Sequence, residues 1–209
     1  MNETQIRSAP VFDLTGGHVC LDFTNTLNGR LDEEPQELLS TYSDLVAWGQ
    51  QAQIVTDEEA RRLLEEETRR PDDAQATLQR AITLREALYH ICEKVVEEAV
   101  PERSDLLILD QVLSQGMVQA HILAEGDGFR WGWEAQGEAL ESVLWVVARA
   151  TADLLTTELR HAVRMCEAED CGWLFLDISK NHSRRWCSMK SCGNRAKARR
   201  YYGRQKPTA

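Results

Sequence analysis

Residues 166–204 read CEAEDCGWLFLDISKNHSRRWCSMKSCGNRAKARRYYGR. This stretch interleaves four cysteines with arginines and lysines. Cys166 and Cys171 form one C-x4-C pair, and Cys187 and Cys192 form a second pair after an interval of fifteen residues. Each pair can cap a tight turn, and two facing turns present four sulfurs at the corners of a tetrahedron, about 2.3 Å from one metal ion. The spacing therefore predicts one structural Zn²⁺ per chain. A closed site of this kind leaves no coordination position for catalysis.

Two structural disulfides, or unpaired thiols, are the alternative interpretation of these cysteines. The chain opens MNETQIR, without the apolar core of a secretory signal, so we expect a cytoplasmic protein in a reducing compartment. Such a compartment favours zinc over disulfides. Cys20 and Cys92 lie in apolar helical patterns and are expected to be small buried hydrophobic residues. His182 could replace one sulfur, although a solvated loop histidine is the simpler expectation.

The charge of the chain is strongly divided between its two parts. The net charge is −10, but residues 160–209 hold 12 Lys and Arg against 4 Asp and Glu, a balance of +8. Residues 1–159 hold 12 against 30, a balance of −18. This asymmetry is typical of a basic nucleic-acid-binding module joined to an acidic body. We therefore expect an acidic N-terminal domain over residues 1–160 and a basic zinc finger over residues 161–209.

The C-terminal segment predicts a small finger whose last helix contacts DNA. Residues 173–177 alternate as a strand, residues 185–187 are expected to return as its partner, and a helix should begin near Asn194. This order resembles a treble-clef-like finger. Asn194 and Arg195, at the start of the helix, could read base edges. The expected backbone contacts on the helix and in the preceding loop are Lys197, Arg199, Arg200 and Arg204, with Lys180, Asn181, Ser183, Arg184 and Arg185.

These basic residues have a second interpretation. They could offset the double negative charge of a four-thiolate zinc centre and keep a small module soluble. Twelve basic residues exceed what one metal site needs, so nucleic-acid binding is favoured.

The first 160 residues predict a mainly α, multihelical domain with one small β-hairpin. Helical periodicity is seen at residues 19–27, 43–51, 72–99 and 138–159, and a capping box at Thr56 and Glu59 predicts a helix up to residue 69 or 70. Ser104 is expected to cap a further helix, and residues 11–14 could form a short strand. The last long helix, ending near residue 159, is expected to lead directly into the first cysteine pair.

The hairpin is expected over residues 118–123 and 129–133, joined by a glycine- and aspartate-containing turn. Trp131 and Trp133 alternate with a glycine and should lie on one face, as a lid on the core, or as the lining of a ligand cavity or dimer face. Asp22, Asn25 and Thr26 fall between apolar helical positions. We expect them to fix their helix against a neighbour by hydrogen bonds, with a small-molecule pocket as the alternative.

Residues 171–187 and 192–202 resemble the CGNR zinc finger, which is named for the residues at 192–195. The first 160 residues show a looser resemblance to the ABATE domain. It is carried by Gly16-Gly17 and Leu21-Asp-Phe-Thr-Asn-Thr26, which are similar to the start of that domain. Proteins of this family are bacterial stress-induced transcription regulators. The resemblance implies zinc on the four cysteines named above and DNA as the partner of the surrounding basic residues.

The sequence thus predicts a DNA-binding transcription regulator. Because operators are usually read by two-fold dimers, we expect a homodimer through the acidic domain, which could also hold a small-molecule effector. An RNA-binding or ribosome-associated zinc protein is the alternative. A zinc hydrolase is disfavoured because four cysteines leave no place for a bound water, so we expect no enzyme. No apolar run approaches the ~18 residues of a membrane span.

Overall fold

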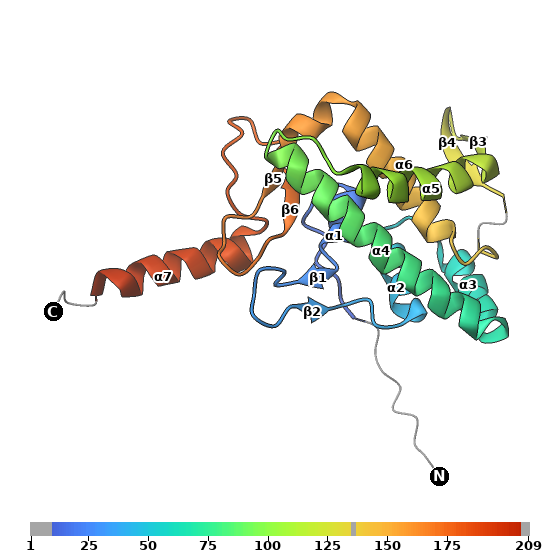
Figure 1. Ribbon diagram of the computed structural model, residues 1–209, viewed down its shortest axis with the longest axis horizontal. Coiled ribbons are helices and arrows are strands. Elements are labelled where there is room, and N and C mark those ends of the chain that lie inside the picture. Colours follow the sequence, from blue (N-terminus) through green and yellow to red (C-terminus); the bar gives the residue numbers. More distant parts are fainter. Residues whose placement is uncertain (1–9, 135–136, 206–209) are drawn as a thin grey trace, which may run out of the picture.

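A computed structural model of the chain describes residues 10–134 and 137–205, the last four of these as backbone only. The fold is mainly helical, as expected, and Figure 1 shows a bundle of helices from which the C-terminal helix projects. The helices of the body are α1 (Val19–Thr24), α2 (Tyr42–Gln51), α3 (Asp57–Arg69), α4 (Pro71–Val96), α5 (Arg103–Gln119) and α6 (Ser142–Thr156). The projecting helix is α7 (Asn194–Gln205). No helix within the described ranges is long and apolar enough to cross a membrane.

Local signals explain where several of these helices begin. The capping box at Thr56 and Glu59 is confirmed, and Thr41 forms a second one with Asp44 at the start of α2. Pro71 opens α4, where its missing N–H costs nothing. The prediction for Ser104 was wrong, because Ser104 lies inside α5, which begins at Arg103. Its N-cap is Glu102, which makes no side-chain capping bond.

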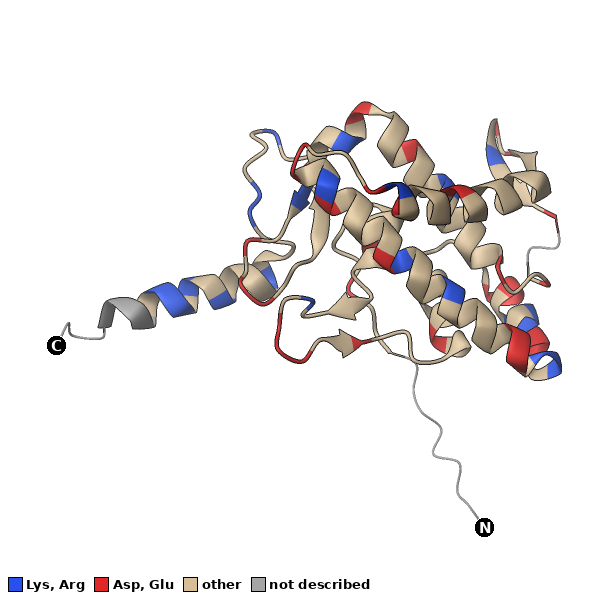
Figure 2. Cartoon of the chain, viewed as in Figure 1, with Lys and Arg blue, Asp and Glu red and all other residues tan. Residues whose placement is uncertain are grey.

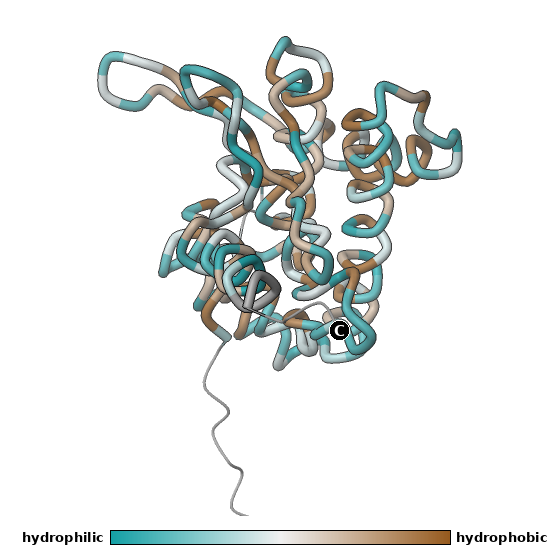
Figure 3. The backbone as a smooth tube through the Cα atoms, turned by 90° about the vertical axis from the view of Figure 1, so that its left-hand side faces the viewer, coloured by the Kyte–Doolittle hydropathy of each residue, from teal (hydrophilic) through white to brown (hydrophobic). Residues whose placement is uncertain are grey.

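The core forms where α1, α2, α4 and α6 meet. Phe23 and Trp48 are fully buried, and their ring centroids lie 5.0 Å apart. Leu88 of α4 and Val147 of α6 complete this interior. Leu174 belongs to the same buried cluster although it lies in the C-terminal segment. In Figure 3, viewed from the side on which α7 projects, brown apolar segments run through this body.

The expected hairpin is present as β3 (Ala120–Glu125) paired antiparallel with β4 (Gly128–Trp133). Gly126 has a φ of 60° in the turn, a conformation that glycine adopts without steric cost. Trp131 and Trp133 lie on one face, and the guanidinium of Arg149 from α6 stacks on Trp131 at 4.8 Å from the ring centroid. Phe129 is 79% exposed at the tip of the same face.

The expected strand at residues 11–14 is absent. The N–H of Phe12 instead donates to the side chain of Gln51 at 3.0 Å, so this extended segment lies against α2 without a strand partner. A short antiparallel pair of strands follows α1, formed by β1 (Leu27–Asn28) and β2 (Gln36–Glu37). The sequence did not predict this pair. These two-residue strands are too short for a recognisable alternation.

Two further predictions about the C-terminal segment were wrong. The strand β6 (Leu174–Leu176) pairs with β5 (Val163–Met165) and not with residues 185–187. Because β5 and the 3₁₀ helix Glu158–Ala162 follow α6, that helix does not lead directly into the cysteines. The first cysteine pair lies instead in the connection between β5 and β6, where a hairpin holds its two ends together.

Candidate metal centre and nucleic-acid interface

The four cysteines of residues 166–192 come together in one buried cluster. Cys166 and Cys171 lie between β5 and β6, and Cys192 lies in the helical turn Met189–Gly193 that leads into α7. All four sulfurs lie within 4.8 Å of one another, and Cys187 Sγ is 3.6 Å from both Cys171 Sγ and Cys192 Sγ. A tetrahedron with metal–sulfur bonds of ~2.3 Å has edges of about 3.8 Å, so the arrangement fits zinc.

The disulfide alternative does not fit this geometry. All six cysteines are free thiols. Cys20 and Cys92 are fully buried in the helical core, as expected for small hydrophobic residues. His182 is exposed, and its Nδ1 lies 3.0 Å from the carbonyl oxygen of Asp177, outside the cysteine cluster.

Hydrogen bonding within the cluster gives its thiols different pKa values. Bonds from Cys171 and Cys187 lower the pKa of Cys166 to about 2, whereas the bond to Cys166 raises the pKa of Cys171 to about 12. The same neighbours raise the pKa of Cys187 far above its usual value. Crowded thiolates repel one another, and a divalent cation that prefers soft sulfur ligands removes this conflict. The donor set is therefore suited to one structural zinc ion.

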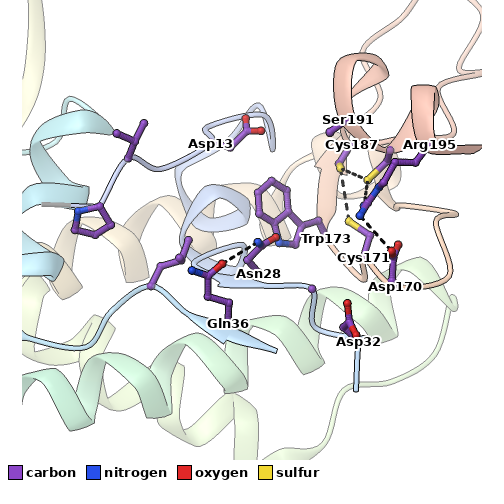
Figure 4. Close-up of a pocket in the computed structure, with 15 residues that line it drawn as sticks. Asp13, Asn28, Asp32, Gln36, Asp170, Cys171, Trp173, Cys187, Ser191 and Arg195 are labelled. Carbon is purple, nitrogen blue, oxygen red and sulfur yellow. Dashed lines mark hydrogen bonds and ion pairs between the residues drawn. The ribbon is translucent and has the colours of Figure 1, made fainter. Parts of the chain in front are cut away.

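Arg195 links α7 to the metal centre. Its Nη2 donates to Cys192 Sγ at 3.2 Å, and its Nη1 lies 3.1 Å from Asp170 Oδ2 (Figure 4). The bond to Cys192 raises the pKa of Arg195. One turn later, Arg199 reaches Asp170 at 3.1 Å and Glu169 at 3.3 Å. The first two turns of α7 are thus tied to the first cysteine turn.

Asn194 and the loop arginines also have partners within the chain. Asn194 Nδ2 donates to the carbonyl oxygen of Lys190 at 3.2 Å, and Arg185 pairs with Glu167. The guanidinium of Arg184 donates to the carbonyl oxygens of Trp186 and Thr15, both at 3.0 Å, and of Leu176 and Cys187. It also lies 4.3 Å from the centre of the Phe175 ring. Arg184 therefore holds the finger together and also ties it to Thr15 of the body.

The remaining residues of the expected DNA surface are exposed. Lys180, Asn181 and Ser183 lie in the loop after β6, and Lys197 and Arg200 lie on α7. Figure 2 shows the blue of lysine and arginine along α7 and in this loop. The side chain of Arg204 falls outside the described residues. Neither Lys197 nor Arg200 has an ion pair within the part of the chain that the structure describes.

The finger is joined to the helical body by buried hydrogen bonds. The Asn25 side chain donates to the carbonyl oxygen of Leu174 at 2.9 Å and accepts from the Leu174 N–H at 3.0 Å. The indole of Trp173 donates to the carbonyl oxygen of Leu27 at 3.1 Å. The expectation that Asn25 fixes its helix against a neighbour is confirmed, and the neighbour is β6.

Sequence reasoning missed two acidic residues of the finger. Asp170 pairs with Arg195 and Arg199 of α7, and buried Asp177 accepts from the N–H groups of Ser179 and Arg184. The signal that could have found them is their rarity, since only four acidic residues lie within residues 160–209.

Comparison with known families agrees with this geometry. Residues 17–158 match the model of the ABATE family, described as "Putative stress-induced transcription regulator", and residues 162–205 match the CGNR zinc finger. No curated protein matches the chain. Neither family description is that of an enzyme. The chain belongs to the ABATE family and carries a C-terminal CGNR zinc finger with one structural zinc site.

Proposed function

We propose that this member of the ABATE family is a transcription regulator that binds double-stranded DNA through α7, the loop at residues 178–183 and Arg185. The observation that carries the proposal is the position of α7, which projects from the body as a basic helix (Figures 1 and 2). A projecting helix of this kind can enter a DNA groove without bringing the acidic body close to the phosphates. A regulator acting on the chromosome would work in the cytoplasm.

The proposed DNA contacts fall into two groups, according to whether the side chain already has a partner within the chain. Lys197 and Arg200 are the primary phosphate contacts on α7, because both are exposed and have no ion pair among the described residues. Lys180, Asn181 and Ser183 supply contacts from the loop. These groups position the helix and carry little sequence information.

The other expected contacts already bind groups within the chain. Arg185 and Arg199 are about half exposed, and both could exchange a carboxylate for a phosphate. Exposed ion pairs of this kind contribute little to stability, so the exchange of partner is inexpensive. Asn194 remains the candidate for a base contact at the start of α7. Arg184 is left out of the interface because four carbonyl oxygens hold its guanidinium.

The proposal is tested by fluorescence anisotropy of a labelled random duplex with the full zinc-loaded chain over a salt series. Affinity should fall steeply between ~50 and ~200 mM salt, and should be lost after zinc chelation. The double variant Lys197→Ala/Arg200→Ala removes two phosphate contacts and should reduce the slope of log affinity against log salt by about 1.8.

Arg103→Ala is the matched control, because Arg103 is an exposed arginine at the start of α5 on the acidic body. It should leave the slope unchanged. The proposal would be refuted by a duplex affinity that does not depend on salt, or by a double variant with the slope of the control. Mass measurement of the complex tests the homodimer that we also propose, since a two-fold operator requires two chains.

An RNA-binding role is the second candidate, and Tyr201 is the observation that favours it. This side chain lies on α7 and is 60% exposed, and exposed aromatic rings stack on unpaired bases. Single-stranded RNA of matched length, added as a competitor in the same assay, separates the two candidates. Displacement of the duplex at lower concentrations of RNA than of unlabelled duplex would establish the RNA role.

A further inference from the structure

A hollow of about 370 Å³ lies between the loop that follows β6 and the turn that leads into α7. The residues that line it are Ser179, Ser183, Arg184, Arg185, Trp186 and Met189, and none of these is a cysteine of the metal centre. The loop and the turn lie at the end of the molecule from which α7 projects (Figure 1). The hollow therefore lies between the two parts of the proposed DNA surface, and its volume is sufficient for a small organic group.

The walls of the hollow offer flat surfaces for stacking. The indole of Trp186 is partly buried, and the guanidinium of Arg185 lies 5.1 Å from the centre of its ring. Met189 is 51% exposed and adds a polarisable thioether. Aromatic rings and guanidinium planes are the side-chain surfaces on which unpaired nucleobases stack. A guanidinium that stacks through its plane can still donate to a phosphate from its edge.

The loop that forms one wall is fixed by contacts within the finger. Buried Asp177 accepts from the N–H of Ser179 at 3.0 Å and from the N–H of Arg184 at 2.9 Å. The N–H of His182 donates to the carbonyl oxygen of Ser179 at 3.1 Å. Attraction of phosphates does not require a fixed loop, whereas a pre-formed hollow lowers the entropic cost of ordering a ligand. The rigidity of this loop therefore favours a group that enters the hollow.

Positive charges flank the hollow on both sides. Lys180 follows Ser179 in the loop, Lys190 follows Met189 in the turn, and both lysines are exposed. Proteins that bind unpaired strands combine aromatic stacking surfaces with cations that track the backbone. Since each base of a strand is carried between two phosphates, this arrangement fits one nucleotide of a strand better than a free aromatic molecule.

We propose that the hollow receives one unpaired nucleobase of a DNA duplex, which stacks against Trp186 and Arg185. Lys180 and Lys190 contact the phosphates on either side. The inference rests on the proposed DNA binding and deepens it, because it states which form of duplex the finger prefers. A paired base must first be unstacked, whereas a base that is already unpaired avoids most of this cost. The finger therefore binds a duplex with an unpaired base more tightly than a fully paired one.

The test compares three duplexes by fluorescence anisotropy with the full zinc-loaded chain. One is fully paired, the second carries one extra unpaired adenosine, and the third carries the same extra nucleotide without its base. Stacking of one base on an aromatic side chain should make the second duplex bind at least about fivefold more tightly than the first. The third duplex keeps the flexibility of the bulge and should bind like the paired duplex.

Two variants locate the base. Trp186→Leu keeps an apolar side chain in the finger but removes the ring, so the preference for the bulged duplex should disappear. Met189→Ala, at an exposed position of the hollow, should reduce the preference at least about twofold. Met117→Ala, at an exposed position on α5 of the body, is the matched control and should leave the preference unchanged. Because each preference is a ratio of two affinities of one variant, a general change in DNA binding cancels.

The possible failures can be told apart. Equal affinity for the paired and bulged duplexes overturns this inference and leaves the proposed DNA binding intact. A preference that the duplex without the base shares, or that either variant retains in full, also overturns it. If Trp186→Leu no longer binds zinc, Met189→Ala decides alone. Absence of binding to all three duplexes overturns the proposed function, and this inference with it.

Discussion

Replacing Asn25 by alanine should destabilise the whole chain. Its amide makes two buried hydrogen bonds to the backbone of Leu174, at 2.9 and 3.0 Å, and Asn25 and Leu174 are 3% and 0% exposed. Alanine would leave both the N–H and the C=O of Leu174 without partners in the interior. Each buried orphan group costs about 1–3 kcal/mol, so the free energy of unfolding should fall by about 2–6 kcal/mol.

Urea unfolding followed by circular dichroism, with saturating zinc, measures this loss. In a thermal melt, 1 kcal/mol shifts the Tm by about 2–4 °C for a chain of this size, so a loss of about 4 kcal/mol should lower the Tm by roughly 8–16 °C. Because Leu174 belongs to the same core as the helices, the finger and the body should unfold in one transition.

Asn28→Ala is the matched control for this experiment. Asn28 lies three residues further along the chain, and its exposed amide makes one bond of 3.4 Å to Gln36. Its loss should cost less than about 0.5 kcal/mol. If Asn25→Ala cost no more than this control, the reasoning that Asn25 attaches β6 to the body would be refuted.

Two further predictions concern the zinc centre and the pH dependence of stability. Arg195→Ala should weaken zinc binding about tenfold, because it removes a donor to Cys192 Sγ, whereas Arg199→Ala, which shares Asp170 but touches no sulfur, should change it less than about twofold. Competition with a chromogenic chelator measures both, and equal affinities would show that the sulfur contact is unimportant. Burial raises the pKa of Asp22 from 3.8 to about 6, so its contribution to stability is present at low pH and is lost as the pH rises through about 6. The loss approaches about 3 kcal/mol between about pH 4 and about pH 6.5, and Asp22→Asn should flatten the stability profile in urea melts across this range. Parallel profiles for the two proteins would contradict the assignment.

Several features of this protein follow from local sequence patterns. The metal centre was predictable because two C-x4-C pairs restrict the geometry of their own turns, and the four sulfurs do meet. The hairpin and most helices were predictable for a similar reason, since a turn at Gly126 or a cap at Thr56 acts over a few residues.

Short strands were predicted less well. The partner of β6 was assigned to residues 185–187, but the chain uses β5, which is three residues long. Such a strand shows too little alternation to be recognised, and its pairing is decided by packing against the body rather than by its own residues.

The basic residues also show which properties follow from local sequence and which depend on packing. The positive charge of the C-terminal segment can be counted from its residues, because composition does not depend on the fold. The partners of the individual arginines depend on how the chain folds. Arg184 donates to Thr15 across 169 positions of sequence, and Arg195 donates to a metal-site sulfur. Asn25 likewise meets Leu174 from 149 positions away. Such partners are brought together by burial of a common core, and no local spacing in the sequence records them.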